Sequence, residues 1–100
     1  MAAQKSISCK LTAPELQKRK ATVIIELKRL LQYKEEIDNG FSYSFESADD
    51  ILDKINDFIK TERICCDFFT FQLKVEGSKT FLTITGPAGA KEFLKDEINF

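Results

Sequence analysis

The residues best suited to chemistry in this chain are two adjacent cysteines, Cys65 and Cys66, with Glu62 one helical turn before them. Thiolate sulfur is polarisable, so a pair of thiols favours a soft ion such as Cu(I), Hg(II) or a trivalent arsenical. Cys9 is a candidate third sulfur ligand if its segment lies close. Adjacent cysteines lack the Cys-x-x-Cys spacing that lets two sulfurs converge on zinc, so the zinc signal is weak.

The same residues also have a purely structural interpretation. Free cysteine is among the most buried residue types, which favours Cys65 and Cys66 filling space beneath the phenylalanines of residues 68–71, and Cys9 lying on the apolar face of a strand. Glu62 is either an acid in a pocket or one half of a salt bridge at the edge of the core. Both interpretations stay open at this point.

Composition excludes several classes of function. The chain has no histidine, which removes imidazole-based acid/base catalysis and the zinc sites that need imidazole. Its formal net charge of -1 gives no electrostatic footprint for nucleic acid or an anionic membrane. The short basic run 17–20 lacks interleaved aromatic residues and is expected to be a solvated helix face. We expect no nucleic-acid or membrane partner.

The location of the protein follows from two further features. No apolar stretch of signal-peptide or membrane-spanning length begins the sequence. The cysteines number three, which is odd, and two of them are adjacent, so a structural disulfide framework is not expected. We therefore expect a cytoplasmic protein with reduced thiols.

Periodicity and turn residues predict one domain over residues 1–100. The expected elements are a strand at 7–11, a helix from the capping box at Thr12 to about 32, a hairpin over 33–45, a helix over 48–65, a hairpin turning at 77–78, and a helix from Ala90. The fold class is α+β, a two-layer sandwich with a mainly antiparallel sheet and helices packed on it, in the order β-α-β-β-α-β-β-α. A ferredoxin-like wrap is the nearest familiar alternative.

The side-chain pattern sets a register for each hairpin. A two-residue turn at 77–78 places Val75 opposite Thr80 and gives a consistent apolar face. In the first hairpin, a three-residue loop places Phe41 opposite Ile37 and predicts Gly40 as a left-handed bulge. The following helix should be capped near Ser47 and should carry an apolar stripe that continues towards Glu62 and the cysteines.

Three segments together resemble a family of small bacterial proteins of uncharacterised function. They are 62–71 (ERICCDFFTF), 82–87 (LTITGP) and 91–94 (KEFL), against a family pattern of Glu-Arg-x-Cys-Cys-Pro-Phe, a Gly-Pro turn and a Phe-Leu helix. The resemblance implies a cytosolic bacterial domain in which Glu62, Cys65 and Cys66 form a constellation, with Cys9 as a further candidate member. Asp67 stands where the family has proline, which stops the helix less firmly and adds negative charge beside the thiols.

We therefore expect a binding protein rather than an enzyme. Cys65 and Cys66, supported by Glu62, would contact a soft metal ion, a metalloid or another thiol-reactive small ligand, with Cys9 as a further metal ligand. The alternative is a protein-interaction or structural domain, with a homodimer as one form, in which the cysteines are core packing. Its surface would be the second face of the last hairpin, comprising Thr70, Gln72, Lys74, Phe81, Thr83 and Thr85. A thiol enzyme ranks last because the helix C-terminus opposes a thiolate.

Overall fold

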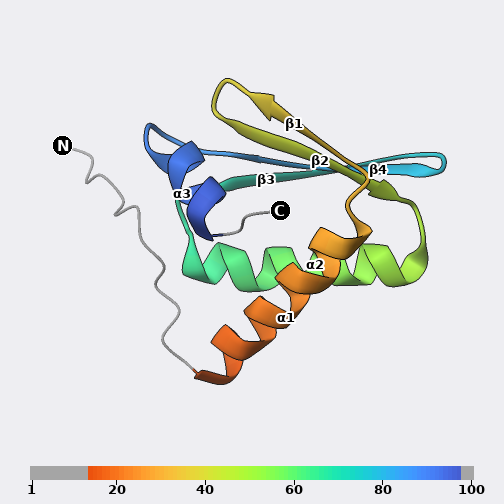
Figure 1. Cartoon of the computed structure of the whole chain (residues 1–100), viewed down its shortest axis with the longest axis horizontal. Coiled ribbons are helices and arrows are strands. Elements are labelled where there is room, and N and C mark those ends of the chain that lie inside the picture. Colours follow the sequence, from red (N-terminus) through yellow and green to blue (C-terminus); the bar gives the residue numbers. More distant parts are fainter. Residues whose placement is uncertain (1–13, 98–100) are drawn as a thin grey trace.

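The computed structural model describes residues 14–97, except for the side chains of Cys65 and Glu97. Its elements are α1 (Pro14–Leu30), β1 (Tyr33–Ile37), β2 (Gly40–Glu46), α2 (Asp49–Cys65), β3 (Thr70–Glu76), β4 (Lys79–Thr85) and α3 (Ala90–Glu97). The α+β class is confirmed, and the described elements follow the predicted order (Figure 1). The predicted strand at 7–11 and the cap at Thr12 lie outside the described residues.

The strands form a four-stranded antiparallel sheet in the order β1-β2-β4-β3. The helices lie against one face, with α2 running along the sheet and α1 crossing α2 (Figure 1). Alternate residues of the two central strands supply the buried side of the sheet, and α2 adds one apolar stripe to the same core. The principal core side chains are Leu27, Phe41, Tyr43, Phe45, Ile55, Phe58, Leu82, Ile84 and Leu94.

The last hairpin has the predicted register. Val75 lies opposite Thr80, and Glu76 lies opposite Lys79 at the end of the hairpin. Gly77 opens the two-residue turn with φ of 58°, a conformation in which only glycine has no steric penalty. This part of the fold follows from local alternation and turn chemistry alone.

The predicted register of the first hairpin is wrong. Ile37 pairs with Gly40 across a turn at residues 38–39, and Gly40 is not in the left-handed conformation. Its role is instead to allow close approach, because Gly40 lies opposite Thr85 and a Cβ there would collide with the backbone carbonyl of Ile84. The glycine therefore serves the contact between β2 and β4 rather than the turn.

This register places charged residues of β1 opposite the aromatic residues of β2. It is tolerated because the long side chains reach past the core: Lys34 lies 5.5 Å from the centre of the Phe41 ring, and Glu36 contacts Lys91 of α3 at 2.6 Å. The hydrogen bond and positive charge from Lys91 lower the pKa of Glu36. Glu36 of β1 thus attaches α3 to the sheet.

The second helix carries the predicted apolar stripe, but its predicted cap is wrong. Ile51, Ile55 and Phe58 are buried against the sheet. The N-cap residue is Ala48, which makes no side-chain capping bond, while the Ser47 hydroxyl lies 2.7 Å from that of Thr80 on β4. Ser47 therefore fixes the start of α2 to the sheet. Within residues 14–97, no helix combines the length and the apolar character needed to cross a membrane.

Candidate functional site

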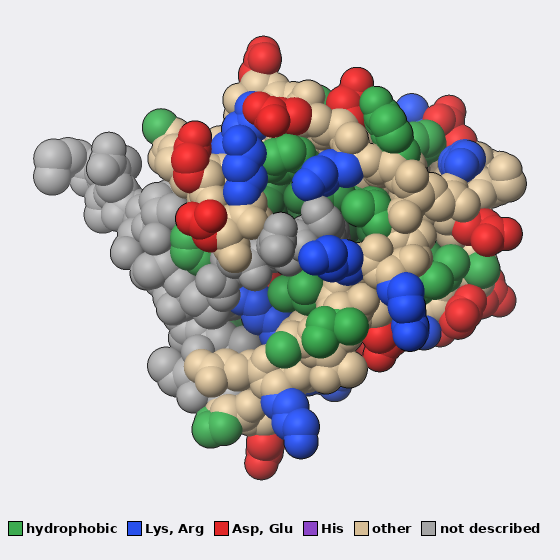
Figure 2. Space-filling model, in the orientation of Figure 1, with side chains coloured by type: hydrophobic (Ala, Val, Ile, Leu, Met, Phe, Trp, Pro, Cys, Tyr) green, Lys and Arg blue, Asp and Glu red, His purple; other side chains and the backbone are tan. Residues whose placement is uncertain are grey.

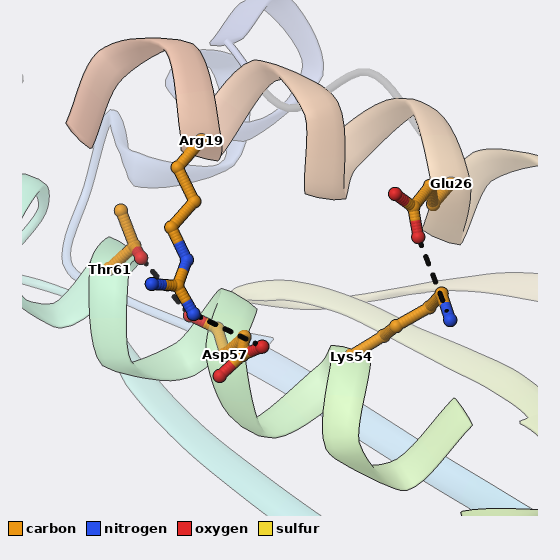
Figure 3. Close-up of polar contacts among 5 residues, drawn as sticks. All are labelled: Arg19, Glu26, Lys54, Asp57 and Thr61. Atoms are coloured by element: carbon orange, nitrogen blue, oxygen red, sulfur yellow. Dashed lines mark hydrogen bonds and ion pairs between the residues drawn. The ribbon is translucent and has the colours of Figure 1, made fainter. Parts of the chain in front are cut away.

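The interface between α1 and α2 is held in register by two ion pairs at its edges (Figure 3). Arg19 contacts Asp57 at 3.3 Å, and Glu26 contacts Lys54 at 3.7 Å. Because Arg19 and Glu26 are seven residues apart on one helix and Lys54 and Asp57 are three apart on the other, each pair of residues lies on one helix face. The helices are therefore antiparallel at this contact.

This register directs a further lysine of α1 into the interior. The Lys20 ammonium lies 3.3 Å from Oε2 of Glu62, and the side chains of the two residues are 8% and 0% exposed. The other carboxylate oxygen, Oε1, accepts a hydrogen bond from the thiol of Cys66 at 3.7 Å, which is also buried. The site is thus a Lys20–Glu62–Cys66 cluster, in which one carboxylate connects an ammonium group and a thiol.

Lys20 is the residue of this cluster whose burial differs from the expectation for its segment. It belongs to the basic run 17–20, which was expected to be solvated, and its burial contradicts that expectation. Its position gives the signal that was available: Lys20 lies three residues before Val23 and seven before Leu27, the buried residues of α1. Lys20 is buried despite its charge because it lies on the apolar stripe of α1 and Glu62 supplies the opposite charge.

The end of α2 places Glu62 and Cys66 together. They are four residues apart, so their side chains lie on the same helix face. The helix ends with Cys66 as its C-cap, whose amide donates to the carbonyl of Glu62 at 2.6 Å and whose carbonyl accepts from the amide of Phe69 at 3.2 Å. The chain therefore turns directly after α2, with Asp67 in the turn.

Aromatic side chains gather next to the cluster in the sequence and in space. The rings of Phe68 and Phe69 lie 4.6 Å apart, and Phe68 meets Phe93 of α3 edge-on at 5.3 Å. Phe68 and Phe69 are buried, as is Cys66. Apolar surroundings of this kind reduce the screening of the Lys20–Glu62 charges by water.

The structure locates two of the four sequence-predicted site residues with their side chains. Glu62 and Cys66 are in contact, as the helical stripe predicts. The backbone of Cys65 ends α2, but its side chain and all of Cys9 lie outside the described parts. Within the described parts, no three cysteine, aspartate or glutamate side chains are grouped so that they could hold a metal ion. One sulfur and one carboxylate are therefore in place, and the full ligand set stays a prediction.

The alternative surface is the sheet face opposite the helices. It contains a hollow of about 320 Å³ that spans three neighbouring strands. Its lining is Ser42, Gln72, Lys74, Glu76, Phe81 and Thr83, which includes four of the residues expected there. On the face of the molecule that Figure 2 shows, lysine and arginine side chains are scattered singly among hydrophobic and acidic ones.

The fold and the cluster together define a small α+β protein with a buried thiol, carboxylate and ammonium group in its helical layer. Comparisons with protein-family models, curated proteins and solved structures find no match to this chain. The resemblance to the small bacterial proteins with a Cys-Cys-Pro-Phe segment therefore stays a prediction.

Proposed function

We propose that the protein binds a soft metal ion, a metalloid or another thiol-reactive ligand through Cys66 and its neighbour Cys65, without catalysing a reaction. One observation carries the proposal: the Cys66 thiol donates to a buried carboxylate whose second oxygen is paired with a buried lysine. Sulfur supplies the soft ligand, and Glu62 supplies a base next to it.

The energetics of burial support a functional role for this cluster. Taking two charges out of water is expensive, and a well-packed apolar pair of similar volume is often as stable or more so. A small domain has little surplus stability to offset that cost. Buried charged groups grouped with a thiol are accordingly candidates for a functional site, whereas core packing of Cys66 alone would require neither Glu62 nor Lys20.

Binding through both cysteines displaces one proton from each thiol: the Cys65 proton is released to the solvent, and the Cys66 proton stays within the cluster. A soft ion must displace the thiol proton, because the thiolate is the metal ligand. The S–H bond of Cys66 breaks, a sulfur–ion bond forms, and the proton passes to Oε1 of Glu62. Lys20 keeps the carboxylate paired before the ligand arrives. No oxidant or second substrate is required for this step.

Two further parts of the proposal concern ligand set and location. Cys9 is proposed as an additional sulfur ligand, since thiolate sulfur selects soft ions and a third thiolate would extend the donor set of Cys65 and Cys66. A cytoplasmic location fits the proposal because a reducing compartment keeps such thiols free of disulfides. A bacterial origin is proposed from the resemblance of residues 62–71.

The test is a titration of the reduced protein with Cd(II), Hg(II) or phenylarsine oxide, followed by native mass spectrometry. We expect one ligand per chain, and loss of binding in Cys66→Ser and Cys65→Ser. Glu26→Gln is the matched control, because it removes a carboxylate from the outer side of the same helix pair and should leave binding intact. Retained binding in the variant lacking both cysteines, or no stoichiometric binding by the wild type, would overturn the proposal.

Alkylation of the folded protein provides a second readout. Cys66 lies at the end of a helix, where local opening costs less than global unfolding. We expect Cys66 to be labelled faster than the protein unfolds and to be protected when the ligand is bound. Labelling only at the rate of global unfolding would instead support the core-packing interpretation.

The hollow on the open sheet face favours a second candidate function, which is protein interaction. It is lined by polar side chains around Phe81, a composition suited to a recognition surface. In that case Phe81→Lys would abolish association with a partner or a second copy, while Cys66→Ser would leave it unchanged. Sedimentation of the purified protein measures the case of a second copy directly.

A further inference from the structure

The outer strand β3 carries apolar side chains that the helices do not cover. Leu73 and Val75 point to the same face of the sheet as the core, yet they are 41% and 52% exposed. Their partners on β4, Leu82 and Thr80, are fully buried. The apolar layer therefore extends one strand beyond the cover that the described helices provide.

The hairpin geometry shows which backbone groups of β3 face outward. Glu76 and Lys79 close a two-residue turn, so this pair exchanges hydrogen bonds within the hairpin. Because bonding alternates along an antiparallel pair, the amide and carbonyl groups of Phe71, Leu73 and Val75 point away from β4. These groups lie on the side of β3 that no described strand occupies.

The two edges of the sheet differ in how well they resist pairing. The opposite edge strand, β1, has five residues, of which three in a row are charged, and Lys91 of α3 contacts it through Glu36. Short length, charge and a covering helix are the usual protections of an edge strand. Strand β3 has seven residues, of which only Lys74 and Glu76 are charged; both line the hollow on the open face, and the outward-facing backbone groups belong to apolar residues. Within residues 14–97, β3 is therefore the longer and less protected of the two edges.

We propose that β3 pairs antiparallel with β3 of a second copy of this chain, with Leu73 on the two-fold axis. In this register Phe71 lies opposite Val75 of the second copy and Leu73 opposite Leu73, so every outward backbone group finds its complement. On the open face, Gln72 meets Lys74 and Thr70 meets Glu76. The two sheets become one continuous sheet.

Self-complementarity is the reason for naming a second copy as the occupant. Antiparallel pairing about a two-fold axis presents the same strand to itself, and this strand has apolar residues at each outward position. A shift of the register by one place along each strand shortens the overlap in either direction, and in one direction it also sets Lys74 against Lys74. Overlap length and charge together thus favour the register centred on Leu73. The pairing involves no thiol, so its test is separate from that of ligand binding.

The first experiment measures the mass of the full-length reduced chain by sedimentation equilibrium over about a hundredfold range of concentration. We expect a monomer–dimer equilibrium, and a monomer throughout for Leu73→Lys, which brings two like charges together on the axis. Ile25→Lys is the matched control, since Ile25 is 66% exposed on α1, away from β3, and its replacement should leave the dimer intact. A wild-type monomer at every concentration, or a dimer that Leu73→Lys leaves unchanged, would overturn the proposal.

A second pair of variants tests the register. Leu73→Cys should form an intermolecular disulfide under mild oxidation, because the two side chains face each other across the axis, whereas Lys74→Cys should do so far less. The wild type under the same conditions gives the background from its own cysteines. Preferential cross-linking of the Lys74→Cys chain would refute this register.

Backbone exchange identifies what covers the edge. We expect protection of the Phe71, Leu73 and Val75 amides to rise with protein concentration, and Val75→Pro to abolish dimerisation while the fold survives, because that amide points outward. A monomer in which these amides are already protected would show that residues 7–11, the predicted strand, cover the edge instead. That result would overturn the dimer.

Discussion

Removing either member of the Lys20–Glu62 pair should destabilise the protein far more than removing a surface pair. At the observed separation of 3.3 Å, two unit charges attract by about 5 kcal/mol at an effective dielectric constant of about 20. Breaking a buried pair also leaves one charge in the interior without compensation, and such losses are typically about 3–5 kcal/mol. We expect Lys20→Met and Glu62→Gln each to lower the free energy of unfolding by about 3–5 kcal/mol.

The control is the exposed pair between the same two helices. Arg19 and Asp57 are 57% and 38% exposed, so Asp57→Asn should cost less than about 1 kcal/mol. The comparison is matched because both pairs join α1 to α2 at 3.3 Å and differ mainly in burial. Figure 3 shows the position of the exposed pair.

The assay is urea unfolding followed by circular dichroism, with the four chains of a double-mutant cycle. The Lys20→Met/Glu62→Gln double variant should recover most of the loss, because a neutral pair leaves no buried charge, and it should be about as stable as the wild type or more so. Two results would refute the reasoning: single variants as mild as Asp57→Asn, or a double variant whose loss equals the sum of the single losses.

Two other predictions concern the sheet. Burial raises the pKa of Tyr43 well above its ordinary value. The stability that the neutral Tyr43 side chain contributes is therefore complete below about pH 10 and is lost as the pH rises further. Tyr43→Phe should reduce this loss of stability at high pH in a series of urea titrations. Gly40→Ala should cost about 3 kcal/mol, because the new methyl group meets the backbone carbonyl of Ile84 rather than a flexible side chain, and an unchanged urea midpoint would contradict the close approach of β2 to β4.

The two hairpins show how far local sequence determines strand register. The register of the 77–78 hairpin follows from alternation and turn residues, because both signals lie within residues 70–85. The register of the first hairpin does not follow from local sequence. Matching polarity across β1 and β2 predicts a three-residue loop, whereas Gly40 is required by its close contact with the backbone of Ile84, more than forty residues away. A glycine before a strand has two physical uses, and only the long-range contact decides between them.

The candidate site shows the same division between local and long-range information. Helical spacing alone brings Glu62 and Cys66 onto one face, so their contact was predictable. Lys20 was predictable from its position on the apolar stripe but not from its residue type. Predicting its contact with Glu62 also requires knowing that α1 packs antiparallel on α2. That packing is visible only in the structure, from the contacts of Arg19 and Glu26 with α2.

Glu62 couples ligand binding to the packing of the two helices under the proposed function. The carboxylate that receives the Cys66 proton is the one that holds Lys20, so protonating it removes the attraction across the α1–α2 interface. The edge pairs, which involve Arg19 and Glu26, are too exposed to compensate fully. A ligand that displaces the thiol proton therefore acts on the same group as the Glu62→Gln substitution. Ligand binding therefore loses the attraction between Lys20 and Glu62. The more strongly this pair holds α1 on α2, the weaker the ligand affinity.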